Sequence, residues 1–151
     1  MIDARDQIED VLYAYADLVD RARLDELLDL FTEDAVLDYG HGRVFTGRDT
    51  LRGLFADRLL ATYRATSHHI SNVHVEVDAD QARATCHVYA WHERADDGAT
   101  PQVWGRYFDD LVRTTDGWRI SRRVIRAAGE QGFPVPEGLP SAFERFDRDG
   151  S

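Results

Sequence analysis

Apolar side chains follow two different periods along this chain, and the change between them limits the possible folds more than any other feature. Up to about residue 63 they recur at spacings of three and four, which is the period of an amphipathic helix. From about residue 66 to residue 127 they alternate with polar side chains, as in strands with one buried face. Helices followed by strands predict an α+β fold and not a βαβ repeat.

The first part of the chain predicts three helices, and the second part predicts four long strands joined by short turns. The helices are expected over residues 3–22, 24–31 and 49–63, with a short strand at 35–40. Short turns between strands produce an antiparallel meander. A twisted sheet of long strands can curl into a cone whose mouth holds a ligand. We therefore expect a cone-shaped, strongly curved antiparallel or mixed sheet that packs against three N-terminal helices and encloses a pocket.

The length of 151 residues corresponds to one domain, since single hydrophobic cores serve roughly 100–200 residues. Residues 1–130 are expected to form the cone domain. Residues 131–151 include three prolines within seven residues, and proline interrupts a strand ladder. We expect this segment to run extended over the surface as a tail, without forming a separate domain.

Charge and composition exclude several classes of function. The formal charge is −10, which disfavours binding to nucleic acid. All 18 basic residues are arginine, so lysine-dependent Schiff-base and P-loop chemistry are excluded. Cys86 is the single cysteine, and no apolar run approaches the ~18 residues of a membrane span. With an acidic N-terminal segment that does not resemble a signal peptide, these features predict a soluble cytoplasmic protein without membrane or nucleic-acid partners.

Six histidines offer the first candidates for chemistry: His41, His68, His69, His74, His87 and His92. No HExxH or HxH pattern occurs, so we expect neither a metal nor another cofactor. His68 begins a predicted strand, and His87 lies on the same strand face as Tyr89 and Trp91. If both faces are concave, two imidazoles point into one aromatic-lined cavity, which suits proton transfer near neutral pH. Alternation alone leaves open which face is concave.

Asp20 lies at the edge of the apolar stripe of the first helix, about 120° from its centre. A solvated aspartate is the ordinary interpretation at such a position. Ala16 and Tyr15, however, extend the apolar arc toward Asp20. A carboxylate there could reach a histidine on the facing sheet, fix its tautomer and stabilise its imidazolium form.

Four segments resemble the SnoaL-like branch of the nuclear transport factor 2-like superfamily, over about residues 3–127. They are AYADLVDRARLDELLDLFTEDAVLDY, GRVFTGRDTL, ATSHHISNVHVEVDADQARATCHVYAWH and WGRYFDDLVRTTDGWRISRRVI. Within this branch the sequence is most similar to scytalone dehydratase, the bile-acid dehydratases and hexachlorocyclohexane dehydrochlorinase. The resemblance implies a catalytic pair of Asp20, in YADLVD, and His68, in TSHHISN.

The resemblance also implies further site residues. It places a second catalytic histidine at His87, in CHVYA, and a pocket tyrosine at Tyr15. Tyr107, in WGRY, corresponds to a position that presents a polar side chain to the substrate. The sequence departs from the fungal dehydratase at two positions: Val19 replaces a tyrosine, and Gly105 replaces a serine. These departures bear on which substrate is bound more than on the catalytic pair.

The leading hypothesis is a cofactor-independent lyase, a dehydratase, that acts on a small cyclic or aromatic-like molecule. His68, oriented by Asp20, would take a proton from a carbon beside a carbonyl group, and His87 or Tyr15 would assist at the carbonyl or the leaving hydroxyl. An isomerase or a polyketide-type cyclase would use the same pair. An alternative of another class is a non-catalytic ligand-binding or assembly module, such as a dioxygenase small subunit.

Other side chains permit both a functional and a structural interpretation. Phe55 and Trp91 could line the pocket with Tyr107, or they could fill the core. Arg122 and Arg123 could bind an anionic substrate, although surface pairing with carboxylates is the more ordinary role. Three valines alternate opposite to His68 and would make the outer sheet face apolar, which predicts a homodimer or homotrimer through that face. They are Val73, Val75 and Val77.

Overall fold

A computed structural model describes residues 2–133 of the chain as helices packed against a curved sheet. The helices are α1 (Ala4–Asp20), α2 (Leu24–Asp29) and α3 (Arg48–Gly53), which continues as a π-helical segment, η1 (Leu54–Leu60). The strands are β1 (Phe31–Asp38), β2 (Val44–Thr46), β3 (Tyr63–Asp78), β4 (Gln81–Arg94), β5 (Gln102–Thr114) and β6 (Gly117–Gln131). The three predicted helices and four predicted long strands are confirmed, and β1 begins four residues earlier than expected.

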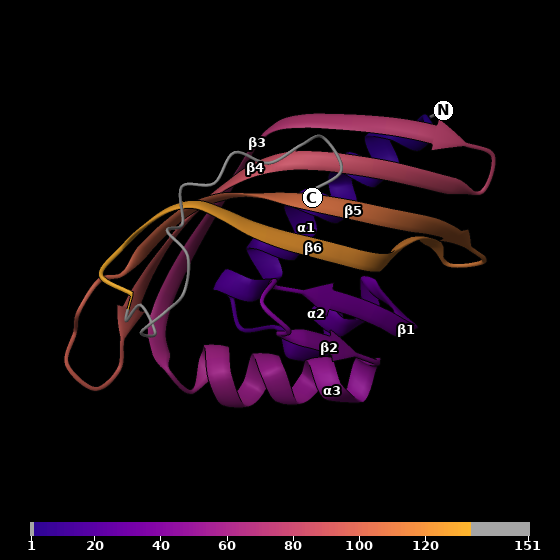
Figure 1. Cartoon of the computed structure of the whole chain (residues 1–151). Helices are drawn as coiled ribbons and strands as arrows, with labels where there is room; N and C mark the ends of the chain where they lie inside the picture. The colour runs from indigo at the N-terminus through magenta and orange to yellow at the C-terminus, as the bar shows by residue number, and fades with distance from the viewer. Residues whose placement is uncertain (1, 134–151) are drawn as a thin grey trace.

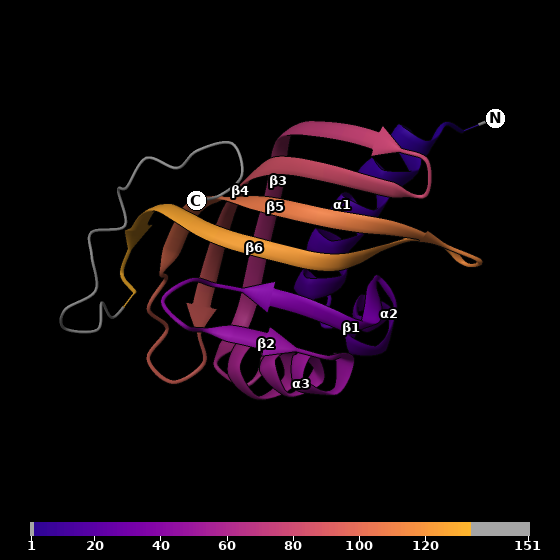
Figure 2. The same ribbon diagram turned by 45° about the vertical axis from the view of Figure 1, so that its right-hand side comes forward.

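The six strands form one mixed sheet in the order β2-β1-β6-β5-β4-β3. Strands β3 to β6 pair as an antiparallel meander, whereas β1 runs parallel to β6. The long strands bend together, with α1 behind them and α3 beside β2 at the lower edge (Figures 1 and 2). The prediction of an α+β fold with a curved, mixed sheet and N-terminal helices is therefore confirmed.

Helix α1 determines where the site is formed. The Asp3 side chain caps its first turn by accepting a hydrogen bond from the Asp6 amide at 2.9 Å. Most of its apolar stripe is buried, at Ile8, Leu12, Tyr15 and Val19, as the three-and-four spacing predicted, and the helix packs mainly against β3. The helix ends at Asp20, and Ala22 then turns the chain with a φ of 54°. The carboxylate of Asp20 is thereby brought against the sheet.

Strand β4 shows which face of the sheet is concave. Its even-numbered side chains from Ala82 to His92 are buried, and the odd-numbered ones between them are exposed or half-buried. Cross-strand pairing carries this assignment to the neighbouring strands: His68 faces Ala90, and Tyr107 faces Cys86. His68 and Tyr107 therefore point into the cone.

A β-bulge in β3 corrects the expectation of an apolar outer face. The register of β3 against β4 shifts between Ser71 and His74, and Asn72 adopts a φ of 52°. One inserted residue exchanges the two faces of a strand, so Val75 faces buried Ala84 after the bulge. The three valines point to the helix side, and the prediction that they make the outer face apolar is wrong.

The predicted tail over residues 131–151 begins at the last residue of β6, and its part from residue 134 onward lies outside the described residues. Across residues 2–133, no helix combines the length and the apolar character that a bilayer span requires.

Candidate active site

Asp20 and His68 are in direct contact at the junction of α1 and β3. Oδ1 of Asp20 lies 2.7 Å from Nδ1 of His68, and the backbone amide of His68 donates to Oδ2 at 2.8 Å. The hydroxyl of Thr66 donates to Oδ1, also at 2.8 Å. The carboxylate is thus held by three donors from two residues of β3. Asp20 ends α1 as the sequence predicted, whereas His68 lies within β3 (Tyr63–Asp78) and does not begin it.

The hydrogen bonds determine the charge of the carboxylate and the tautomer of the ring. Burial alone would raise the pKa of Asp20, but the bonds from the His68 ring, the His68 amide and Thr66 lower that pKa below its usual value. An ionised carboxylate accepts and does not donate, so Nδ1 of His68 carries a proton, and in the neutral ring the lone pair is on Nε2. The His68 side chain is 7% exposed and that of Asp20 is 23% exposed, so bulk water reaches the pair only partly.

His92 is a neighbour of the pair that the sequence analysis named but did not assign. It lies opposite Thr66 on β4, and its ring centroid is 5.6 Å from that of His68. The rings of Tyr63 and Phe133 enclose it, at 4.7 and 5.4 Å. The alternation of β4 could have identified His92, because it lies two residues after buried Ala90 and therefore on the same, inner face of the strand.

The His92 ring is held neutral. Its Nδ1 lies 3.3 Å from the backbone oxygen of Pro101, and since a carbonyl can only accept, Nδ1 carries the proton and Nε2 is an acceptor. Burial, together with the adjacent His68 ring, lowers the pKa of His92 to about 4. Two imidazole rings therefore lie next to each other inside the cone, and within residues 2–133 no hydrogen bond is seen at either Nε2 atom.

His87 and Trp91 do not join this group. Both occupy odd positions of β4 and point to the outer face, where His87 lies opposite Ser71 and its Nδ1 is 3.2 Å from Nδ2 of Asn72. Burial and the nearby charge of Arg106 lower the pKa of His87. The prediction that His68 and His87 share one cavity is wrong, because strand alternation separates them onto opposite faces.

Tyr15, Tyr107 and Phe55 all lie inside the cone and are buried. The ring of Tyr15 contacts those of Tyr107 and Phe55 edge-on, at 5.7 and 6.3 Å between centroids. The guanidinium of Arg123 lies 4.1 Å from each tyrosine ring and forms a bidentate ion pair with Asp109, at 2.7 and 2.8 Å. Both charged side chains are fully buried, so the expectation of a surface role for Arg123 is wrong.

Gly105 explains one departure from the fungal dehydratase pattern. It lies opposite Val88 on the inner face. A Cβ atom at this position would come within 2.4 Å of the backbone oxygen of Arg126, so the bulged strand leaves no space for a side chain. A side chain that contacts the substrate, like the serine of the fungal dehydratase, is therefore excluded at this position.

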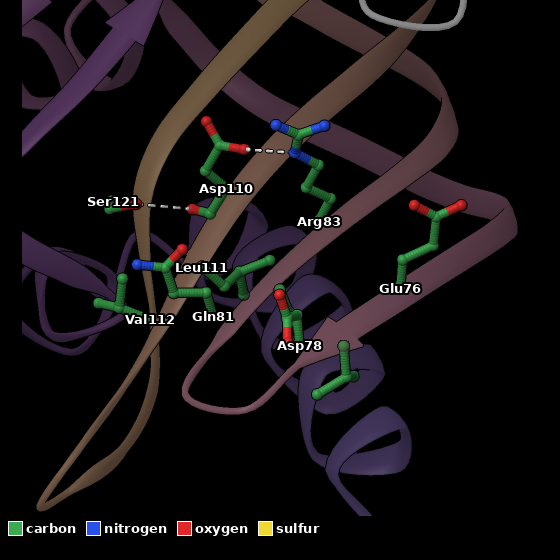
Figure 3. A pocket seen from close by; sticks show the side chains of 10 residues that line it. Glu76, Asp78, Gln81, Arg83, Asp110, Leu111, Val112 and Ser121 are labelled. Carbon is green, nitrogen blue, oxygen red and sulfur yellow. Dashed lines mark hydrogen bonds and ion pairs between the residues drawn. The ribbon is translucent and has the colours of Figure 1, made fainter.

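Two hollows on the sheet surface lie away from the pair. One is at the end of β3–β6 farthest from His68, where Arg83 pairs with Asp110 at 3.8 Å and Ser121 donates to the Asp110 backbone oxygen at 3.1 Å (Figure 3). The other includes His87, Asn72 and Phe108 on the outer face. Among the described residues that line these hollows, none belongs to the Asp20–His68 pair. Two of the ion pairs at these hollows, Arg83 with Asp110 and Arg122 with Asp38, join neighbouring strands, which is typical of a solvated sheet surface.

Comparisons with known proteins agree with this geometry. The SnoaL-like domain matches residues 1–124. The chain belongs to the SnoaL-like family. This family is part of the nuclear transport factor 2-like superfamily, as the sequence resemblance implied. An uncharacterized protein from Mycobacterium tuberculosis is 34% identical over 128 residues, which are 82% of this chain and 84% of the relative.

Similar solved structures include proteins with different assigned reactions. One from Novosphingobium aromaticivorans, provisionally assigned as a scytalone dehydratase, is 28% identical with a TM-score of 0.79, covering 89% of this chain and 93% of its own. Another from the same organism, provisionally assigned as an aromatic ring hydroxylase, is 32% identical with a TM-score of 0.81, covering 86% and 93%. A type 2 hexachlorocyclohexane dehydrochlorinase shares the fold at 19% identity, with a TM-score of 0.77 and coverage of 89% and 95%. The two Novosphingobium structures support a family of enzymes that process small molecules, and the dehydrochlorinase shows the shared fold.

Proposed function

We propose that this SnoaL-like protein is a cofactor-independent lyase, a dehydratase, that acts on a small cyclic or aromatic-like molecule. The observation that carries the proposal is the 2.7 Å contact between Oδ1 of Asp20 and Nδ1 of His68, in a largely buried setting. This contact leaves Nε2 of His68 available as a base, and it places a negative charge where the imidazolium forms. A positioned base of this kind contributes roughly 10²–10⁴-fold in rate.

The reaction can be written with these groups alone. Nε2 of His68 takes a proton from a carbon beside a carbonyl, and the electron pair of the broken C–H bond forms an enolate. The enolate electrons then form a C=C bond as the C–O bond of a neighbouring hydroxyl breaks. The departing oxygen takes the proton back from His68 and leaves as water. Asp20 stabilises the imidazolium between the two transfers, and the pair returns to its starting state.

His92 takes the place that the sequence analysis gave to His87. Its neutral ring lies 5.6 Å from His68, so its free Nε2 can accept a hydrogen bond from the substrate hydroxyl or from a bridging water. In this role His92 is a positioning residue that aims the leaving group toward the imidazolium. Tyr15 is proposed as a donor within the cone, and Tyr107 and Phe55 are proposed to contact the substrate.

The same pair would support two related reactions. If the proton returns to a different carbon, the protein is an isomerase, and if the enolate attacks a second carbonyl of the same molecule, it is a cyclase. The provisional assignment of the 28% identical structure favours dehydration over these alternatives. The alternative of another class is a non-catalytic module that binds a ligand or holds an oligomer together.

The proposal includes a cytoplasmic homodimer or homotrimer that forms through the outer sheet face. On the outer face of the sheet lie the aromatic rings of Tyr89 and Trp104, with centroids 5.4 Å apart, and not the valines that the sequence predicted there. Trp104 is 43% exposed, which is large for an indole ring. Such a face could be covered by a second copy of the chain.

Proton exchange tests the proposed base without knowledge of the natural substrate. Small cyclic ketones are incubated with the protein in D₂O, and loss of the α-proton signal is followed by NMR. We expect the wild-type protein to accelerate the exchange, His68→Ala to abolish the acceleration, and Asp20→Asn to weaken it strongly. His69→Ala is the matched control, because this neighbouring histidine points to the other face and contacts Ser67 at 2.9 Å. Exchange in His68→Ala at the wild-type rate, or none above background in the wild type, would contradict the proposal.

A further inference from the structure

Three hydrogen-bond donors from one short stretch of β3 converge on the carboxylate of Asp20. Oδ1 accepts from the Thr66 hydroxyl at 2.8 Å and lies 2.7 Å from Nδ1 of His68, while Oδ2 accepts from the His68 amide at 2.8 Å. Thr66 and His68 are two residues apart in a strand, so their side chains point to the same face. The catalytic pair needs only the contact with the ring, and the other two donors therefore serve another purpose.

The place of β3 in the sheet makes a backbone donor available to Asp20. β3 is the last strand in the order β2-β1-β6-β5-β4-β3, so within residues 2–133 it pairs with β4 along one edge only. An edge strand leaves alternate amides without a strand partner. The His68 amide donates to Oδ2 of Asp20, which ends α1 beside this strand. This bond ties one carboxylate oxygen to the backbone, whatever the charge of the His68 ring.

The Thr66 hydroxyl determines the direction of the other carboxylate oxygen. Oδ1 holds two donors, the hydroxyl and Nδ1 of His68, so it is fixed from two sides. The terminal torsion of an aspartate has no sharp preference of its own, and the Asp20 side chain is 23% exposed. Without the hydroxyl, Oδ1 would therefore be free to turn toward water. Threonine suits this task because its branched Cβ restricts χ1 and fits a strand.

The Thr66 hydroxyl and the His68 amide are neutral donors, so they hold Asp20 in the same way before and after His68 takes a proton. Burial raises the pKa of Asp20, but its hydrogen bonds, including that from Thr66, bring the pKa below its usual value. The carboxylate is thus ionised and aimed before the imidazolium forms. An acceptor that needs no reorientation during the reaction is the more effective one. His92, opposite Thr66 on β4, is the other titratable ring at this place.

We propose that Thr66 is a positioning residue that aims the carboxylate of Asp20 at Nδ1 of His68 and thereby keeps Nε2 of His68 unprotonated as the base. This inference rests on the proposed function, since His68 supplies the base. Thr66 acts through Asp20, so the effect of removing its hydroxyl should depend on the presence of that carboxylate.

The tautomer of the His68 ring measures this role without any substrate. Long-range ¹H–¹⁵N correlation NMR, at a pH where the ring is neutral, distinguishes a proton on Nδ1 from a proton on Nε2. We expect the Nδ1 tautomer to dominate in the wild type and in Thr66→Ser, which keeps the hydroxyl. In Thr66→Val, a measurable part of the population should carry the proton on Nε2. Thr66→Ala removes the same hydroxyl in a smaller side chain and should give the same change.

Proton exchange of cyclohexanone in D₂O measures the consequence for the base. Thr66→Val should slow the exchange roughly tenfold, as for the loss of one hydrogen bond to a charged acceptor, and Thr66→Ser by less than about threefold. Thr85→Val is the matched control, because it makes the same substitution on the outer face of β4, opposite His74 and Phe108. Neither the His68 tautomer nor the exchange rate should change in this control.

Addition of Asp20→Asn shows whether Thr66 acts through the carboxylate. Asp20→Asn alone should weaken the preference for the Nδ1 tautomer, and Thr66→Val should change the tautomer no further in that background, because coupled residues are not additive. The wild-type tautomer in both Thr66→Val and Thr66→Ala would overturn the inference. An equal effect of Thr66→Val with and without the Asp20 carboxylate would do the same.

The two measurements together distinguish failure of this inference from failure of the proposed function. A wild-type protein whose His68 tautomer responds to Thr66, but which exchanges no proton, would refute the catalytic proposal and support the positioning of Asp20 by Thr66. Exchange that depends on His68 and Asp20 but proceeds at the wild-type rate in Thr66→Val would refute the role of Thr66 and support the base.

Discussion

Replacing His92 with leucine should flatten the dependence of folding stability on pH between about 6.5 and 4. In the folded protein, burial and the neighbouring His68 ring lower the pKa of His92 from 6.5 to about 4. Between these values the unfolded chain binds a proton at this residue and the folded chain does not. Protonation therefore favours unfolding, and the stability contributed by the neutral ring is present above pH 6.5 and lost as the pH falls to 4.

The size of the effect follows from the pKa shift. One pKa unit corresponds to about 1.4 kcal/mol, so a shift from 6.5 to about 4 corresponds to roughly 3 kcal/mol between pH 7 and pH 4. Leucine also removes the contact with Pro101 and the ring contacts, which lowers stability to a similar extent at every pH. The difference in unfolding free energy between wild type and His92→Leu should therefore change by roughly 3 kcal/mol over this range, in favour of the variant at acid pH.

Urea denaturation at several pH values between 7 and 4 measures this difference. Val88→Ala serves as a packing control, because it creates a cavity on the same face of β4 without a titrating group. Its difference from the wild type should stay constant with pH. If the His92→Leu difference were equally constant, the buried neutral state assigned to His92 would be wrong.

Three more predictions concern the other buried groups. Asp20→Asn should reduce ketone proton exchange by roughly 10²–10⁴-fold, because the amide no longer stabilises the imidazolium; a loss below threefold would count against the pair. Arg123→Met alone should lower the unfolding free energy by about 3–5 kcal/mol, since it leaves Asp109 buried without a partner, whereas addition of Asp109→Leu should recover most of the loss in urea denaturation. Burial raises the pKa of Cys86 to about 12, so a thiol reagent at pH 8 should label this residue only after unfolding, and rapid labelling of the native protein would contradict its placement.

The change from helical to strand spacing of the apolar residues made the fold predictable. Each amphipathic helix or strand buries one side, so its apolar residues repeat with the period of that element. The pair of Asp20 and His68 was predicted from the resemblance of YADLVD and TSHHISN to the SnoaL-like dehydratases, and the structure brings the end of α1 against β3 at His68. The alternation in β4 also assigned its side chains correctly to two faces. Alternation does not show which of the two faces is concave. For that reason we predicted His87, and not His92, as the second histidine of the site.

Two other features depend on contacts that the local pattern does not encode. The bulge at Asn72 inserts one residue into β3 and reverses the faces of the valines after it, and no glycine marks the position. Arg123 directly follows the exposed Arg122, and nothing in the local sequence distinguishes the two arginines. It is buried because Asp109, fourteen positions earlier, lies directly opposite on β5. Pairing across strands, and not local composition, determines which arginine is in the core.

Rescue by free imidazole tests most directly whether the ring held by Asp20 is the base. His68→Gly removes the imidazole and leaves space for it beside the carboxylate. Added imidazole should restore ketone proton exchange in this variant along a saturable curve, and the restoration should be much weaker when Asp20→Asn is also present. If imidazole raised the rate in His68→Gly no more than it does in solution without protein, His68 would not be the group that removes the proton.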